Sequence, residues 1–593
     1  MKNFFIPFIV AVLFFLAAMF VLKQIERRTS NEKFIELRYE DNESLTYYEA
    51  ISAYKALDKQ HDEAKLLTYG KTDSGKPLNL FVISKTGNFS PENLRARGFR
   101  VVMVNNGIHP GEPCGIDVSV KLARDVLGQK ENLWELMDST VLCIVPIYNV
   151  GGSLDQSPYN RANQNGPKTQ GFRANSRYLD LNRDFAPMDS KNAQSFAQMF
   201  HHWKPNLLID THTTNGADYQ YVMTLIPNHW LELPPMLGNY YDKVMEPYLY
   251  KKMEMSGFDM IPYVSPMGQT PESGLEQWVN SPRYTTGYGR MFNTITLMTE
   301  SHMFKPFRDR VLATYEFVKA ALEFTHENGA TLKSLKDKAD NFTKNQKEFV
   351  LHWERDSSKF EMLPFKGYEA ELIKSEVTGD ERLRYRRDMP FVKEVPYYRH
   401  YNPSLTITKP DYYIVPQAWH EVVHRLTING VDMKPLANDT IMEVLAYYIE
   451  NYKTRMQPYN GRYLHYDIEV RKETQNVQFF KGDFIIHTNQ LVNEFIVEML
   501  EPQAYDSYFT WGFFNSVLQR KEYFSPYVFD DYAKQMLDQD ADLKNEFERK
   551  KQLDKEFASN TYAQLNFFYE RSPFFHKGFR RYPIYRSVMS NNN

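Results

Sequence analysis

A histidine and a glutamate lie three residues apart in the segment His109-Pro-Gly-Glu112, which follows a short apolar run typical of a buried strand. A second histidine, His212, directly follows another such run much further along the chain. Two imidazoles and one carboxylate are a usual ligand set of a catalytic zinc ion, and they leave a fourth position for water. Each residue alone is weak, because a single histidine after a strand is more often structural. Together they predict a site for one zinc ion per chain, held by His109, Glu112 and His212.

Further polar motifs stand in order around these ligands. They are Pro146-Ile-Tyr-Asn149, Asp180-Leu-Asn182-Arg183 and Leu297-Met-Thr-Glu300. With the two histidine segments, this order resembles the zinc metallocarboxypeptidase family of the carboxypeptidase A/B type, over about residues 45–325. The resemblance implies the fold of that family, a functional zinc site and hydrolysis of the C-terminal peptide bond.

The resemblance also assigns two carboxylates. Glu300 matches the catalytic carboxylate, which takes a proton from the attacking water and passes it to the leaving amine. Asp180 matches the carboxylate behind the first zinc-binding histidine, His109, where such a partner sets the tautomer and raises the basicity of the ligand.

Two neighbouring residues, Asn182 and Arg183, match the family residues that bind the C-terminal carboxylate of the substrate. Arg183 is expected to bind the terminal carboxylate, because its planar guanidinium can form two parallel hydrogen bonds and stays charged. Asn182 can add a further hydrogen bond. The implied substrate is a peptide with a free C-terminus. The alternative is that Arg183 forms a permanent ion pair with Asp184 or another acid.

Two other assignments have competing candidates. An arginine that stabilises the oxyanion lies upstream of the Asn-Arg pair in the family, and here it could be Arg161 or Arg173; we predict Arg161, because its longer separation from Asn182 suits a loop. The family also has a tyrosine on a loop before the catalytic strand. We predict Tyr288 for this position, with Tyr284 as the alternative.

Strand-like and helical patterns alternate between residues 45 and 330. The strand-like runs are 79–84, 100–105, 140–146, 206–211 and 293–299, and helical spacing occurs at 115–127, 191–202 and 309–327. These patterns predict an α/β catalytic domain whose sheet is covered by helices on both faces. The family resemblance implies a mixed sheet of the eight-stranded type.

The remainder, residues 331–593, has a different pattern. Runs at 412–416, 420–428, 463–470 and 484–487 predict strands of a β-rich accessory domain, and the charged segment 530–557 predicts a helical tail. Two segments beginning at Gly482 and Leu500 resemble the extension of some large bacterial members of the family. We expect this domain to pack on the catalytic domain or shape access to its cleft; binding of carbohydrate or cell wall is the alternative.

The amino terminus contains no charged residue from residue 4 to residue 22. Such a run spans roughly 28 Å as a helix, close to the thickness of the hydrocarbon core of a bilayer. It predicts a transmembrane signal anchor at residues 1–28 and a polar linker at 29–44, with a cleaved signal peptide or a buried helix as alternatives. We expect a membrane-anchored protein outside the cytoplasm, in the periplasm or on the cell surface, or a secreted one if the segment is cleaved.

Composition narrows the functional classes. A net charge of −3 argues against a dedicated nucleic-acid binder, and two cysteines are too few for a disulfide framework or a cysteine metal cluster. The predicted function is therefore a zinc-dependent metallocarboxypeptidase. A zinc amidase that acts on cell-wall peptides or another small amide is the first alternative, and a non-catalytic interaction protein that keeps only the fold is the second.

Overall fold

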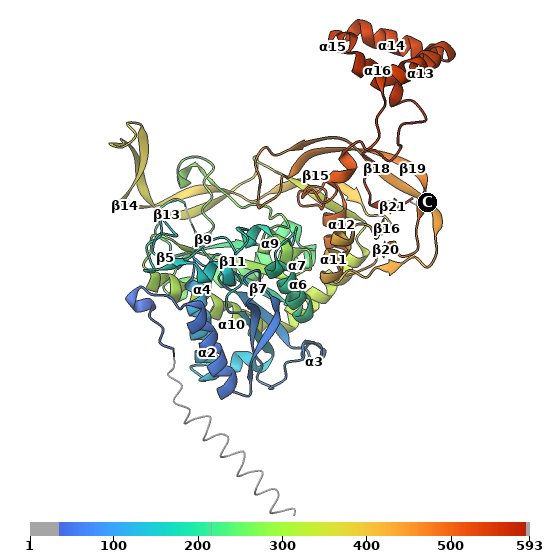
Figure 1. The fold of residues 1–593 in the computed structure, drawn as a ribbon. Coiled ribbons are helices and arrows are strands. Elements are labelled where there is room, and N and C mark those ends of the chain that lie inside the picture. Colours follow the sequence, from blue (N-terminus) through green and yellow to red (C-terminus); the bar gives the residue numbers. More distant parts are fainter. Residues whose placement is uncertain (1–34, 215, 589–593) are drawn as a thin grey trace, which may run out of the picture.

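The computed structural model describes residues 35–214 and 216–588 (Figure 1). The catalytic domain is built on an eight-stranded sheet in the order β1-β2-β4-β3-β7-β11-β8-β9. Its strands are β1 (Ala64–Lys71), β2 (Pro77–Ile83), β3 (Arg100–Asn105), β4 (Thr140–Val145), β7 (Leu207–Thr214), β8 (Met223–Pro227), β9 (Met260–Pro262) and β11 (Ile295–His302). Strands β4, β3, β7 and β11 are parallel, and antiparallel neighbours flank them. The predicted mixed α/β sheet is confirmed.

Helices cover both faces of this sheet. In β3, Val102 and Val104 join a core cluster with helices α2 (Tyr47–Gln60), α4 (Cys114–Leu127) and α10 (Phe307–Asn345). The alternate residues Val101 and Met103 join a second cluster, which includes helix α6 (Lys191–Trp203). Because successive side chains of a strand point to opposite faces, a central strand buried on both sides is apolar throughout. This explains why these strands stand out in the sequence as continuous apolar runs.

Helix α10 does not end at the predicted domain boundary, residue 330. It continues to Asn345, and Leu332, Ala339 and Thr343 on its second half are buried. The polar, lysine-rich composition that suggested a boundary belongs to the exposed side of this amphipathic helix. The accessory region, here called the C-terminal module, therefore begins at residue 346.

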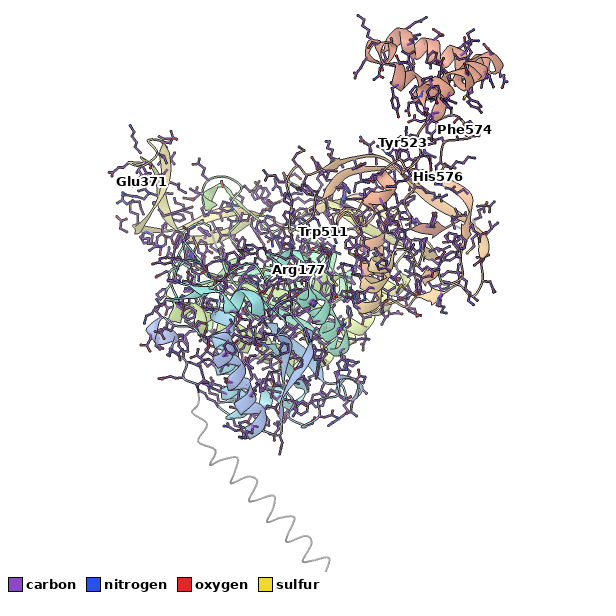
Figure 2. The ribbon with its side chains drawn as sticks, viewed as in Figure 1. Arg177, Glu371, Trp511, Tyr523, Phe574 and His576 are labelled. Carbon is purple, nitrogen blue, oxygen red and sulfur yellow. The ribbon has the colours of Figure 1, made fainter. Side chains whose placement is uncertain are left out.

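The C-terminal module contains a six-stranded sheet in the order β17-β20-β16-β21-β18-β19. Its strands are β16 (Tyr412–Val415), β17 (Lys434–Pro435), β18 (Thr440–Thr454), β19 (His465–Phe479), β20 (Phe484–His487) and β21 (Tyr585–Ser587). Two further pairs are β12 (Glu348–Arg355) with β15 (Tyr401–Thr408), and the long hairpin of β13 (Glu361–Lys374) and β14 (Glu381–Tyr398), which carries Glu371 near its projecting end (Figure 2).

One predicted strand of the module is a helix. Residues 420–428 form α11 (His420–Ile428), which buries Val422, Arg425 and Leu426. Its β-branched residues suggested a strand, but the buried positions are spaced three and four residues apart, as on one face of a helix.

The predicted helical tail, residues 530–557, is followed by a further helix and a strand. Four helices, α13 (Pro526–Gln539), α14 (Ala541–Leu553), α15 (Lys555–Ser559) and α16 (Thr561–Tyr569), form a small unit with an aromatic core of its own. It projects from the module, with Tyr523 and Phe574 at the connection (Figure 2). The chain then returns, and β21 pairs with β16 and β18 inside the sheet.

The predicted membrane anchor, residues 1–28, lies outside the described residues. Within residues 35–214 and 216–588, no helix combines the length and the apolar character needed to cross a membrane.

Candidate metal centre and substrate cleft

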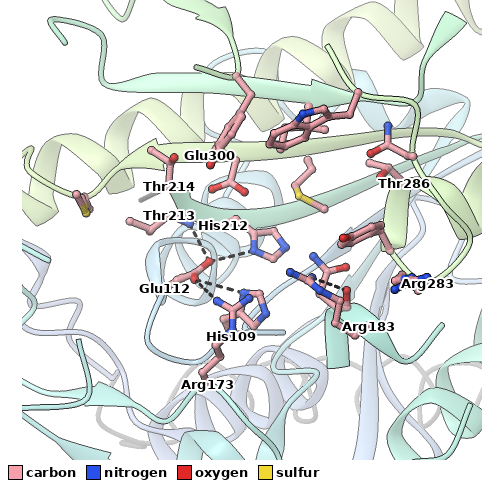
Figure 3. Close-up of a pocket in the computed structure, with 18 of the residues that line it drawn as sticks. His109, Glu112, Arg173, Arg183, His212, Thr213, Thr214, Arg283, Thr286 and Glu300 are labelled. Atoms are coloured by element: carbon pink, nitrogen blue, oxygen red, sulfur yellow. Dashed lines mark hydrogen bonds and ion pairs between the residues drawn. The ribbon is translucent and has the colours of Figure 1, made fainter. Parts of the chain in front are cut away.

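The three predicted zinc ligands meet at the carboxyl ends of neighbouring parallel strands. His109 and Glu112 lie on the turn between β3 and α4, and His212 lies near the end of β7. One potential ligand atom from each residue lies within 4.8 Å of the others. Figure 3 shows the three side chains pointing toward one another. Parallel pairing of β3 with β7 brings the two segments together, although they are far apart in the sequence.

The orientation of the imidazoles suits a metal ion. His109 Nδ1 lies 3.3 Å and His212 Nδ1 3.0 Å from the carboxylate of Glu112. The opposite nitrogens are bound from behind: His109 Nε2 lies 2.9 Å from Asp180 Oδ1, and His212 Nε2 lies 3.0 Å from Asp210 Oδ2. His109 Nδ1 is buried and makes no hydrogen bond within the described part of the chain. A buried nitrogen of this kind fits coordination to a cation, so the residues present fit zinc.

Electrostatics also favour a cation among these ligands. Burial opposes the charged form of Glu112, but His109 and Arg161 outweigh it and hold the pKa of this carboxyl well below its usual range. Burial likewise opposes protonation of His212, yet Asp210 holds the pKa of this imidazole well above its ordinary value. The buried carboxylates thus create a negative potential that attracts a positive charge.

Glu300 lies beside the ligands because of strand register. In the parallel pairing of β11 with β7, Glu300 is directly opposite His212. Burial raises the pKa of Glu300 to about 8, with Glu112 adding to the effect and His212 and Arg173 opposing it. The charge of a bound cation acts in the opposite direction, toward the ionised form that can accept a proton.

Both candidate oxyanion arginines line the cleft. Arg161 Nη2 lies 3.0 Å from Glu112 Oε1, and a side chain at Gly111 would place its Cβ 2.9 Å from Arg161 Cδ. Gly111 is therefore needed for the close packing of Arg161 against the ligand turn. Arg173 Nη2 lies 2.9 Å from Asp180 Oδ2, which ties this arginine to a carboxylate already bound to a ligand histidine. Arg161 remains our prediction.

Arg183 and Asn182 also reach the cleft, as predicted from the motif. The guanidinium of Arg183 donates from Nη1 to the carbonyl of Asn182 at 2.8 Å and stacks 4.6 Å above the ring of Tyr284. Asp184 faces elsewhere, because its carboxylate accepts hydrogen bonds from the backbone amides of residues 189 and 190. The alternative in which Arg183 is paired with Asp184 is not what the structure shows.

Tyr288, predicted at the cleft, is fully buried away from it. Its hydroxyl donates to Asn429 Oδ1 at 2.7 Å, and its ring packs between Phe185 and Phe200. Tyr284 lies at the cleft instead. The reason is helix α9 (Thr285–Arg290), which begins right after Tyr284 and turns the side chain of Tyr288 into the core.

Two site residues were missed in the sequence, Asp210 and Thr285. Thr285 Oγ1 donates to Asp210 Oδ2 at 2.5 Å, and its backbone amide donates to Asn182 Oδ1 at 3.1 Å. Asp210 could have been found, because it stands two residues before His212 and thus on the same face of a predicted strand. Thr285 lies in a stretch whose place in the fold could not be read from its sequence.

The cleft has a volume of about 1030 Å³ and extends beyond the metal ligands and Glu300. A group of uncharged side chains also lines the cleft and is here called the recess. They are Ile226, Val279, Asn280, Ser281, Thr286 and Met298. Tyr505 of the C-terminal module also lines the cleft.

Comparison with known proteins agrees with this site. Residues 51–215 match the family model of zinc carboxypeptidases, a segment that includes all three ligands and ends before Glu300. Carboxypeptidase 2 of Trichophyton rubrum is 20% identical over 470 residues, covering 74% of this chain and 79% of that protein. Carboxypeptidase 2 of Trichophyton tonsurans is 21% identical over 480 residues, covering 75% and 80%.

Solved structures give more distant likenesses. Carboxypeptidase A from Helicoverpa armigera shares 13% identity with a TM-score of 0.38, over 53% of this chain and 82% of that one. A metallo-carboxypeptidase from Burkholderia cenocepacia shares 15% identity with a TM-score of 0.36, over 48% and 70%. The sequence matches confirm the predicted resemblance to zinc carboxypeptidases. Together with the His-Glu-His group, they support the predicted zinc metallopeptidase with one zinc ion.

Proposed function

We propose that this zinc metallopeptidase removes single residues from the free C-terminus of peptides, with Glu300 as general base and then general acid. The observation that carries the proposal is one cleft that holds the three ligands, Glu300 and the arginine-tyrosine pair of Arg183 and Tyr284. Such a cleft has separate places for a scissile carbonyl and a terminal carboxylate.

Each group in the cleft has a definite task. His109, Glu112 and His212 would hold zinc, which supplies Lewis-acid chemistry by activating water and polarising a carbonyl. The carboxylate of Glu300 takes a proton from the attacking water and returns it to the nitrogen of the departing residue. Arg161 is placed to stabilise negative charge on the attacked carbonyl oxygen.

Binding of the terminal carboxylate makes the reaction exopeptidic. The positive charge of Arg183 attracts the terminal carboxylate, and its guanidinium packs against the ring of Tyr284. Asn182 lines the same cleft. Since the C-terminal residue bridges Arg183 and the metal site, its side chain points into the uncharged recess. Burial of a charged side chain there without a partner is unfavourable, so we expect uncharged C-terminal residues to be preferred.

The test is digestion of a library of free-acid peptides, read by mass spectrometry, with a chelator and with zinc restored. We expect stepwise loss of single C-terminal residues, abolished by the chelator and recovered with zinc. Glu300→Gln is the matched control, because it keeps the size of the side chain but cannot accept the proton. Internal cleavage, or cleavage only of small amides without a free carboxylate, would favour the zinc amidase alternative.

A further inference from the structure

The C-terminal module touches the cleft where the substrate terminus is expected. Arg283, next to Tyr284 in the sequence, lines the cleft on the catalytic domain. Its Nε donates to Asp506 Oδ1 at 2.8 Å, and its backbone amide donates to Asp506 Oδ2 at 2.9 Å. Asp506 belongs to the module, so one carboxylate of the module binds both the side chain and the backbone of a residue in the cleft wall.

Asp506 itself is firmly held. It is fully buried, and Trp511 Nε1 donates to its Oδ1 at 2.9 Å. The guanidinium of Arg283 also lies 5.3 Å from the ring of Trp511, which sits where the module meets the catalytic domain (Figure 2). The three donors are the side chain and backbone of Arg283 and the indole of Trp511, so the buried carboxylate has a defined position. Its hydrogen bonds in turn fix the position of Arg283 and of the adjacent Tyr284.

A second part of the module contacts the segment that carries Asn182 and Arg183. In the connection between β18 and β19, Asn460 Oδ1 accepts a hydrogen bond from the backbone amide of Asp180 at 2.7 Å. Arg462 Nη2 donates to Asp189 Oδ1 at 2.7 Å. The segment that carries Asn182 and Arg183 lies between these two anchors.

Tyr505 of the C-terminal module is itself part of the cleft wall. Its side chain is 51% exposed, lines the cleft and stacks on His352, with ring centroids 3.9 Å apart at 13°. A stacked yet exposed aromatic ring at the edge of a cleft is a preformed contact surface for a ligand.

We propose that the C-terminal module is part of the substrate-binding site. Asp506 is a positioning residue, which acts through Arg283 and Tyr284 on the Arg183 that binds the terminal carboxylate, and Tyr505 contacts the substrate directly. This inference rests on the proposed carboxypeptidase function, since it concerns the site that binds the terminal carboxylate.

The test compares Asp506→Asn with wild type on one peptide as the free acid and as the C-terminal amide. For the free acid we expect KM to rise about ten-fold with kcat changed by less than about two-fold, and the preference for free acid over amide to fall. Zinc content should stay at one per chain. The control is Asp467→Asn, which removes an exposed module carboxylate paired with Lys453.

Tyr505→Ala is the second variant, because an exposed ring can be truncated without leaving a buried charge. It should raise KM for both peptides. The inference is overturned if Tyr505→Ala and a folded Asp506→Asn keep the wild-type KM on both peptides, or if Asp506→Asn loses zinc and kcat in equal measure on both. If Asp506→Asn does not fold, Tyr505→Ala decides alone. Wild-type enzyme that cleaves neither peptide would instead refute the proposed function itself.

Discussion

Both ligand histidines have a carboxylate behind the ring, and the two carboxylates are held differently. Asp180 is exposed enough to pair also with Arg173, whereas Asp210 is fully buried and receives hydrogen bonds from Asn105 Nδ2 and Thr285 Oγ1. Asp210 therefore fixes His212 and links it to Thr285, which in turn binds Asn182. The candidate metal ligand His212 and Asn182 thus share one buried network.

Asp210→Asn should weaken zinc binding without abolishing the fold. The amide can still accept from Asn105 or Thr285, but it carries no charge to orient His212 and raise its basicity. Loss of such a partner typically costs about 10- to 100-fold in metal affinity. Competition with a chelator measures this, and His212→Ala is the reference for complete loss of the ligand. Unchanged zinc affinity would show that Asp210 has only a structural role.

Arg183→Ala should remove the distinction between free-acid and amidated peptides. If Arg183 binds the terminal carboxylate, the wild type loses roughly 2–4 kcal/mol of transition-state binding on the amide, and the variant loses a similar amount on the free acid. Values of kcat/KM for both peptides test this. Equal cleavage of both by the wild type would contradict exopeptidase action but leave the zinc site in place.

At the scale of elements, the recess is shaped by the register of β11 with β8. Glu300 pairs with Thr224, and Met298 pairs with Ile226 two residues earlier, so Met298 and Ile226 lie on the same face of the sheet as Glu300. An apolar surface thus continues from Glu300 into the recess.

Ile226→Asp should change the preference for the C-terminal side chain. Wild type should prefer C-terminal leucine over lysine by at least about ten-fold, because Met298 and Ile226 offer no charged partner to a lysine ammonium. A carboxylate at the half-buried position 226 gives the lysine ammonium a partner and should reverse the order. Ile226→Val is the control that keeps the recess apolar. A wild-type preference for lysine would disprove this account of the recess.

A buried charge cluster joins helix α9 to helix α12 (Asn493–Leu500) of the module. Arg290 pairs with Glu232 at 2.9 Å, Glu494 at 2.8 Å and Glu498 at 2.7 Å. One guanidinium thus pairs with three carboxylates. Burial raises the pKa values of Glu232 and Glu498 to about 7 each, although Arg290 opposes this effect.

This cluster makes stability depend on pH. In the unfolded chain the carboxyls of Glu232 and Glu498 lose their protons at about pH 4.3, whereas in the folded chain they keep them until about pH 7. Stability from this source is therefore present at low pH and falls as pH rises through that window. Glu498→Gln should reduce the fall in Tm between about pH 5 and about pH 8. Glu473→Gln, which alters an exposed pair with Arg471, is the control, and equal slopes would contradict the effect.

In the whole molecule, the cleft belongs to the catalytic domain, and the C-terminal module reaches it with Tyr505. Arg290 with Glu494 and Glu498, Arg283 with Asp506, and Asp189 with Arg462 all join the catalytic domain to the module. These ion pairs are partly or fully buried, and removal of one partner from such a pair is costly because it leaves a buried charge. The module is thus attached by buried charged contacts, and one of their members, Arg283, lies in the cleft wall.

Sequence patterns alone predicted four residues that the structure brings together in one cleft. His109, Glu112, His212 and Glu300 were identified because strict ligand chemistry limits the residue types, and because each lies at or just after a strand with a continuous apolar pattern. Strands β3, β4 and β7 were placed within a few residues, since burial on both faces leaves a strong local signal.

Which other residues surround these four depends on packing between segments that are distant in the sequence. Tyr284 rather than Tyr288 faces the cleft because of where α9 begins, and α10 crosses the expected boundary because its buried side packs on distant residues. Asp506 and Tyr505 lie more than two hundred residues from the ligands, in the segment beginning at Leu500, and nothing in that segment predicted a place at the cleft. Their place depends on long-range packing and on the pairing of buried charges, which the periodicity of a single segment does not encode.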